Sequence, residues 1–251
     1  MLLRLDHLVI AVPDPDAAAA ELEGTIGLAC SGGGRHPLWG TFNRLAWLGD
    51  TYIELIGVFD PDLAAAGPVS RPVLAALMAG QSGLVTYALA SDDAASDVSR
   101  LRSAGSAIGA PEMRSRTRPD GEVVTWHAAY AELGPALAPF IVEHELAGAE
   151  WGAPAREARA SFEHPLGGRV RVDGLELPVP DVAASAMAYA DTVGLGLDQT
   201  SSTAHVGDQS VRLVPGRPLQ DPAVILLALD GRATASRRDL DAVGVRWRVV
   251  S

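Results

Sequence analysis

The sequence predicts an α+β fold built from repeated βαβββ modules, and three segments support this prediction. Residues 5–22, LDHLVIAVPDPDAAAAEL, combine an apolar strand-like run, a Pro-Asp pair suited to a helix start, and an Ala-rich helix. Residues 172–189, VDGLELPVPDVAASAMAY, repeat this order with Val-Pro-Asp in the same place. Residues 83–101, GLVTYALASDDAASDVSRL, have the same outline. Internal repeats of this kind indicate modules that share a core.

Each of the three segments is followed by runs with the composition of β-strands. The expected strands are 28–34, 41–48 and 51–58 in the first module, 112–118, 122–130 and 138–145 in the second, and 203–206, 210–214 and 223–229 in the third. A short helix and a strand are expected over 236–250. The Pro/Gly/Ala-rich stretches 60–80 and 147–168 are typical of connectors.

These boundaries predict the organisation of the chain. Residues 1–146 are expected to hold two βαβββ modules, 147–168 a linker, and 169–251 a third, degenerate module. One helix covers only one face of a four-stranded sheet, so two sheets are expected to pair and to enclose a cleft. Such a cleft is the expected place for a small-molecule ligand.

Composition excludes several classes of function. The net charge of −11 argues against nucleic-acid and anionic-membrane partners. All 20 basic residues are arginine, which excludes Schiff-base chemistry on lysine and a lysine-containing phosphate loop. The single cysteine, Cys30, leaves no internal disulfide, and the sequence shows neither a signal peptide nor a transmembrane run. We expect a cytoplasmic protein, and the Ala-rich, Lys-free composition is typical of a GC-rich bacterial genome.

Glu54 and His7 are the strongest candidates for chemistry. Glu54 lies in the apolar strand YIELI (52–56), where burial of an unpaired carboxylate costs several kcal/mol. It is therefore expected to bind a metal or substrate, or else to pair with Arg44 on the adjacent strand. His7 lies in the apolar strand 5–12, either as a ligand or as a core histidine bonded to a backbone carbonyl.

Further candidates lie in the Gly-rich loop SGGGRHPLWGTFN (31–43) and in a later strand. In the loop, Arg35, His36 and Asn43 supply hydrogen-bond donors and Trp39 an apolar wall, so it is expected either to line the cleft or to form a surface turn. It is a poor phosphate cradle, because a strand and not a helix follows it. His127 is a candidate substrate-binding residue on the strand 122–130. His144, His164 and His205 are expected to be bystanders.

Four separated motifs resemble the glyoxalase-like domain proteins of the vicinal oxygen chelate superfamily. They are LDHLVIAVPD (5–14), GGRHPLWGTFN (33–43), YIELI (52–56) and FIVE (140–143), and the resemblance covers about 4–182. It implies the paired-module fold and a divalent metal site with ligands from first and fourth strands. Carried over by position, these ligands are His7, Glu54 and Glu143, with Glu145 on the same strand face as an alternative to Glu143. The first strand of the second module offers Val85, Thr86 or Tyr87 at the fourth position, none of them a good ligand. The third module has Gly174 in place of His7.

The resemblance implies a metal-dependent lyase or isomerase that acts beside a carbonyl of a small oxygenated substrate. A Zn, Mn, Fe, Co or Ni ion would polarise the substrate oxygen while Glu54 or His36 moves a proton. The alternative is a metal-free protein that sequesters a small molecule, such as a drug, between aromatic residues such as Trp39, Trp47 and Trp126. A degenerate structural relative is a third interpretation. A homodimer is left open.

Overall fold

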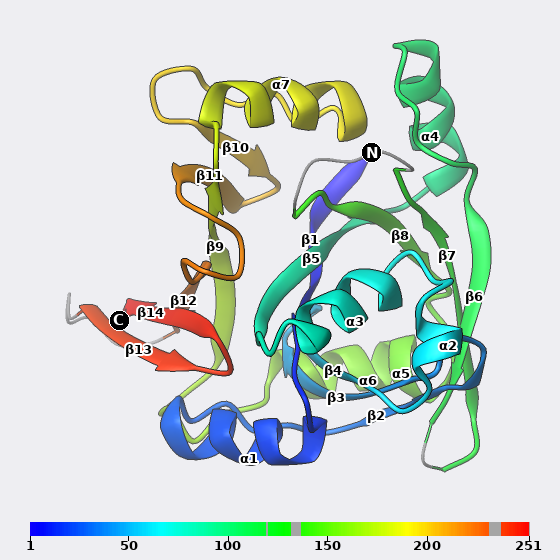
Figure 1. Ribbon diagram of the computed structural model, residues 1–251. Helices are drawn as coiled ribbons and strands as arrows, with labels where there is room; N and C mark the ends of the chain where they lie inside the picture. The colour runs from blue at the N-terminus through cyan, green and yellow to red at the C-terminus, as the bar shows by residue number, and fades with distance from the viewer. Residues whose placement is uncertain (119, 132–136, 231–236, 251) are drawn as a thin grey trace.

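The computed structural model describes residues 1–118, 120–131, 137–230 and 237–250, and within them the first two modules form one closed barrel (Figure 1). The strand order around the barrel is β1-β4-β3-β2-β6-β7-β8-β5. The strand bounds are β1 Leu2–Ala11, β2 Gly33–His36, β3 Thr41–Leu48, β4 Thr51–Val58, β5 Gly83–Ser91, β6 Glu112–Thr117, β7 Val123–Ala129 and β8 Phe140–His144. The predicted α+β class and paired βαβββ modules are confirmed.

The two halves of the barrel repeat one strand arrangement. β1 pairs with β4 in parallel, as β5 does with β8, and the two halves meet where β1 and β5 pair antiparallel. His7 lies opposite Ala88 across that junction. The barrel closes on the other side through β2 and β6, where Arg35 pairs with Thr117.

Helices cover the barrel from outside and close one end. α1 (Pro15–Thr25) begins after Asp14, whose carboxylate accepts the backbone N–H groups of Asp16 and Ala17. The shorter helices are η1 (Pro37–Trp39), α2 (Pro61–Ala64), α3 (Ser70–Met78) and α4 (Ala94–Ser103). α3 belongs to the stretch expected to be a connector, and its Val73 and Ala76 pack with Val9 and Ala11 of the barrel interior. The interior therefore has an apolar floor at the α3 end.

A second sheet packs beside the barrel, on the left in Figure 1. Its order is β10-β11-β9-β12-β14-β13, with bounds β9 Val170–Val179, β10 Thr203–Val206, β11 Gln209–Pro215, β12 Val224–Leu229, β13 Arg237–Ala242 and β14 Val245–Val250. α7 (Val182–Val193) follows β9. The short helix expected over 236–250 is wrong, since 237–250 is the hairpin β13–β14.

A continuous core joins the second sheet to the outer face of the barrel. Leu5 and Leu8 of β1 belong to the same buried cluster as Leu175 and Trp247 of the second sheet. The buried Gln209 side chain spans the junction, since its Oε1 accepts the Leu5 N–H at 2.7 Å and its Nε2 donates to the Val172 carbonyl at 2.9 Å. The boundaries at 146 and 168 remain a prediction. Among the described residues, no helix combines the length and apolar character needed to cross a bilayer.

Candidate functional site in the barrel interior

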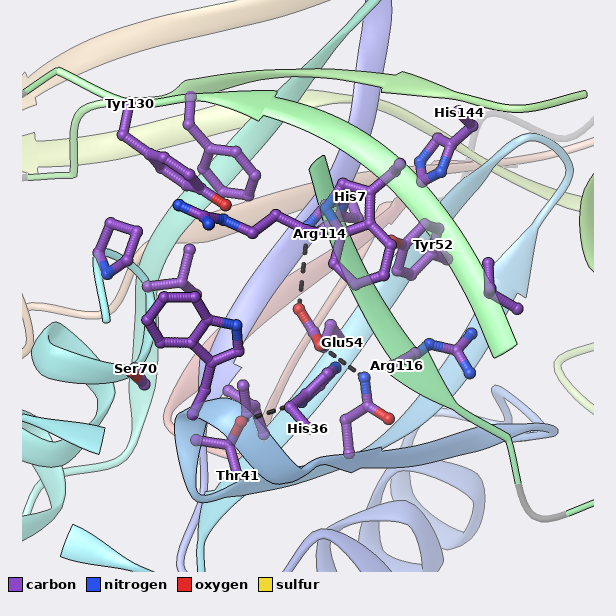
Figure 2. A pocket seen from close by; sticks show the side chains of 18 of the residues that line it. His7, His36, Thr41, Tyr52, Glu54, Ser70, Arg114, Arg116, Tyr130 and His144 are labelled. Atoms are coloured by element: carbon purple, nitrogen blue, oxygen red, sulfur yellow. Dashed lines mark hydrogen bonds and ion pairs between the residues drawn. The ribbon is translucent and has the colours of Figure 1, made fainter. Parts of the chain in front are cut away.

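A cavity opens inside the barrel, above the apolar floor formed with α3 (Figure 2). It encloses about 700 Å³ of empty space, its open mouth included. Side chains from both modules line it, together with one from the stretch after β8. Its lining includes His7, His36, Trp39, Thr41, Asn43, Tyr52, Glu54, Arg114, Arg116, Trp126, Tyr130, Phe140, His144 and Glu150.

A β-bulge places Asp6 beside His7. Leu5 pairs with Leu89 and His7 pairs with Ala88, so Asp6 is the extra residue on β1. A bulge of this kind re-aims a side chain that strict alternation would send to the other face. The Asp6 carboxylate is fully buried, and its Oδ1 lies 2.8 Å from His7 Nδ1 and 2.9 Å from His144 Nε2.

The buried Asp6 carboxylate orients both histidines. Burial alone would raise its pKa, but the two imidazoles reverse this effect and hold the pKa of Asp6 well below its usual range. An ionised carboxylate only accepts hydrogen bonds, so the network assigns the protons to His7 Nδ1 and His144 Nε2. Tyr52 stacks on His7 with ring centroids 4.6 Å apart, and Trp151 stacks on His144 at 3.9 Å. In its neutral form with the proton on Nδ1, His7 presents Nε2 as an acceptor.

Glu54 of β4 lies opposite this acceptor. Its Oε2 is 3.8 Å from His7 Nε2, and its Oε1 accepts a hydrogen bond of 2.6 Å from Asn43 Nδ2 of β3. Both groups are buried. The alternative pairing of Glu54 with Arg44 is absent, because Arg44 forms its salt bridge with Asp16 of α1 at 3.1 Å.

His36 is buried at the cavity wall at the end of β2. Its Nδ1 lies 2.9 Å from Thr41 Oγ1, and Figure 2 shows its ring beside Glu54. Burial lowers the pKa of His36 to about 4, an effect that nearby Glu54 only partly offsets. The imidazole is therefore neutral near pH 7. His36, Trp39 and Asn43 all line the cavity, as the sequence predicts for the cleft.

Three predicted site residues point away from the cavity. Arg35 is exposed and places its guanidinium carbon 3.9 Å from the centroid of the Phe59 ring. His127 is exposed on the outer face of β7. Glu143 accepts the Ala94 N–H at 2.8 Å, at the start of α4 outside the barrel. His7, Glu54 and Glu143 thus do not converge as the predicted metal triad requires.

The physical reason is the register of β8. Phe140 and Val142 face the interior, so the alternation of the strand turns His144 inward and Glu143 outward, the reverse of the expectation. His144 is thus part of the site and not a bystander. In the parallel pairs, Glu54 lies opposite Val9 and Val142 lies opposite Ala90. The second module thus presents Ala88 and Val142 where the first presents His7 and Glu54.

Sequence reasoning missed the charged groups of the second module and of the following stretch. Arg114 and Arg116 alternate inward along β6, and Glu150 lies in α5 (Gly148–Trp151), within the expected linker. Arg116 Nη2 contacts Glu150 Oε2 of α5 at 2.5 Å, and Arg156 of α6 (Ala153–Ala160) pairs with Asp50 at 2.5 Å, so both helices are tied to the barrel. The sequence signal for these arginines of β6 was their spacing of two residues, which places both on the same face of a strand.

Glu143→Ala should cost about 1 kcal/mol of stability and leave ligand or metal binding unchanged, because its carboxylate supports a helix N-terminus. Urea unfolding followed by circular dichroism measures this cost. Glu145→Ala, at an exposed position two residues further on, is the matched control. Loss of metal from the Glu143 variant alone would show that its carboxylate reaches the interior.

A barrel of two βαβββ modules, with a histidine of the first strand and a glutamate of the fourth directed inward, is the architecture of the vicinal oxygen chelate superfamily. More specifically, the family model for a glyoxalase-like domain matches residues 5–193, and the chain belongs to this family. A comparison with curated proteins gave no match.

Two solved structures have similar folds. A hypothetical protein from Staphylococcus aureus is 15% identical with a TM-score of 0.79, over 99% of both chains. A mutant of 4-hydroxymandelate synthase from Streptomyces coelicolor is 16% identical with a TM-score of 0.55, over 92% of this chain and 72% of that chain. At these identities the similarity shows the fold alone.

Proposed function

We propose that the protein is a metal-dependent lyase or isomerase that moves a proton beside a carbonyl of a small oxygenated substrate. The observation that carries the proposal is the 3.8 Å separation of His7 Nε2 and Glu54 Oε2 inside the cavity. This separation is too long for a hydrogen bond, yet it suits two bonds of about 2.0–2.2 Å that meet on one ion. A cation bound between the imidazole and the buried carboxylate would stabilise the ionised form of Glu54.

The donor set fits a divalent ion held from one side. His7 Nε2 and Glu54 Oε2 would bind it, and Asp6 on His7 Nδ1 matches the carboxylate–histidine–metal arrangement that fixes metal ligands. The second module adds no ligand at its equivalent positions, Ala88 and Val142, so the remaining positions would be open to water and substrate. When bound, the ion would supply Lewis-acid polarisation of a substrate oxygen. Asp6, His7 and His144 form the group of three candidate ligands within 4.8 Å of one another among the described residues. The short contacts among these three residues are hydrogen bonds from the two imidazoles to Asp6 Oδ1, so these atoms are already engaged.

The residues of the chain have separate roles in this proposal. Asn43 holds Glu54 Oε1, which leaves Oε2 directed toward His7. His36, neutral and anchored on Thr41, is the group that accepts a proton from the substrate carbon and returns it. Trp126 and Phe140 form apolar walls of the same cavity and exclude water from the reacting atoms.

Metal content tests this proposal directly. After incubation with Zn²⁺, Mn²⁺, Fe²⁺, Co²⁺ or Ni²⁺ in turn and gel filtration, elemental analysis of the wild-type protein should find about one ion per chain with at least one of them. His7→Ala and Glu54→Gln should each reduce retention at least about tenfold, because each removes one of only two ligands. Glu143→Gln is the matched control and should retain the ion. Failure of the wild type to hold any of the five candidate metals would refute the metal-dependent function.

The aromatic lining favours a second candidate, a metal-free binding protein. Trp39, Tyr52, Trp126 and Phe140 line the same cavity, as in a site that holds a ligand by stacking and burial. Trp47, expected in this role, packs on Tyr52 and Trp151 and does not itself line the cavity. Saturable binding of an aromatic ligand by a protein that takes up no metal would favour this function over the first.

A further inference from the structure

We propose that Arg114 is the binding point for a substrate carboxylate, which makes small carboxylic acids with a second, carbonyl-bearing end the substrate class of this site. The part of this inference that concerns the reacting, carbonyl-bearing end of the substrate rests on the proposed function. The carboxylate end depends only on Arg114 and its surroundings.

The two inward arginines of β6 differ in how firmly their charges are neutralised. Arg116 donates to the Gly33 carbonyl at 3.1 Å and contacts Glu150 at 2.5 Å, and both side chains of this ion pair are largely buried. The ionic partner of Arg114 within the described part of the chain is Glu112, whose side chain is 63% exposed. An ion pair with an exposed carboxylate contributes little free energy, so a ligand carboxylate can displace Glu112. Arg114 is therefore the exchangeable cation of the cavity.

The surroundings of Arg114 suit the capture of an anion. Its side chain is only 17% exposed, and its Nε is buried without a hydrogen-bond partner among the described residues. The guanidinium carbon lies 4.9 Å from the Trp39 ring centroid and 5.7 Å from that of Tyr130, so aromatic faces restrict it. A planar guanidinium held in this way binds a carboxylate with two parallel hydrogen bonds.

The charges of the cavity also fix the direction of the ligand. Figure 2 shows Arg114 extending toward Tyr130, away from Arg116, while Glu54 and His7 occupy the middle of the cavity. Without a bound metal ion, the condition of the titrations below, the Glu54 carboxylate repels an anion at the centre. A ligand anchored by its carboxylate on Arg114 would thus present its other, uncharged end to Glu54, His7 and the walls Trp126 and Phe140.

Levulinate and its methyl ester are the probes that test this inference, because both carry a ketone and only levulinate carries a charge. Calorimetric titration of the wild type should show levulinate binding at least about tenfold more tightly than the ester, as expected for a charge-assisted pair. Arg114→Met should remove this preference, and Arg114→Lys should recover part of it. Arg118→Met is the matched control, since Arg118 pairs with Asp120 and Glu122 and does not line the cavity.

Glu112→Gln should strengthen levulinate binding, whereas Arg114→Met should weaken it. Glu112→Gln removes the competing carboxylate, so levulinate should bind about two- to fivefold more tightly, with the ester unchanged. This variant keeps the test valid if Arg114→Met fails to fold. The titrations need no turnover or metal, so they separate this inference from the proposed reaction. Equal binding of levulinate and ester by the wild type, absence of levulinate binding, or preference for inorganic phosphate over levulinate would overturn it.

Discussion

Asp6→Asn should lower the free energy of unfolding by about 3 kcal/mol, as expected when one partner leaves a buried ionic network. The carboxylate is fully buried and holds His7 and His144 through one oxygen, Oδ1. The asparagine oxygen can accept both imidazole N–H groups in place of Oδ1, but the amide carries no charge, and its NH2 group replaces Oδ2, which lies 3.5 Å from the donor Arg4 Nη2. Urea unfolding at neutral pH measures the loss.

Asp173→Asn is the matched control for Asp6→Asn. Asp173 pairs with Arg171 at 2.9 Å, but both side chains are at least 40% exposed. Its replacement should cost less than about 1 kcal/mol. Similar small losses for both variants would mean that the Asp6 network contributes little to stability and serves only to orient His7.

The repeated modules were predictable because local patterns determine them. A Pro-Asp pair before an Ala-rich helix, and alternating strands after it, indicate a βαβββ order without any knowledge of distant contacts. The capping role of Asp14 in the structure matches that pattern. The closure of the barrel between β2 and β6 depends instead on one pairing between residues 82 positions apart, Arg35 and Thr117, which no local pattern encodes.

The site was predictable where a strand has one polar residue among apolar ones. Glu54, His36 and Asn43 met that condition or belonged to a recognised motif, and all three line the cavity. In FIVEH, Glu143 and His144 are adjacent and the preceding residues are apolar on both faces, so alternation alone cannot decide which one turns inward.

Asp6 was missed for a different reason. It is the extra residue of a bulge, and a bulge depends on the pairing of β1 with β5, not on the composition of β1. Strict alternation assigns Asp6 and His7 to opposite faces, whereas the structure brings them into contact. The partner of His7 Nδ1 is thus the carboxylate of its sequence neighbour and not a backbone carbonyl, while the role of His7 as a metal ligand stays a prediction.

The stability of the protein should fall with acid between pH 6.5 and about 4 because of His36. The folded chain keeps this imidazole neutral, since burial lowers its pKa to about 4, whereas in the unfolded chain it binds a proton near pH 6.5. Unfolding therefore takes up a proton in this window, and stability rises with pH across it. Below the window both states are protonated, and above it neither is, so the effect of His36 is confined to this range.

The effect of His36 is measured as a difference between variants. Between pH 7 and pH 4.5, the wild type should lose about 2–3 kcal/mol more unfolding free energy than His36→Gln, which has no proton to take up. Both proteins keep Asp6 and the other carboxylates, so the acid sensitivity of these groups cancels in the comparison. His127→Gln, at an exposed position on the outer face of β7, is the matched control and should behave as the wild type does. Equal pH dependence of the wild type and His36→Gln would mean that the cavity admits a charged imidazole at residue 36, and that this group is protonated where the proposed reaction needs it neutral.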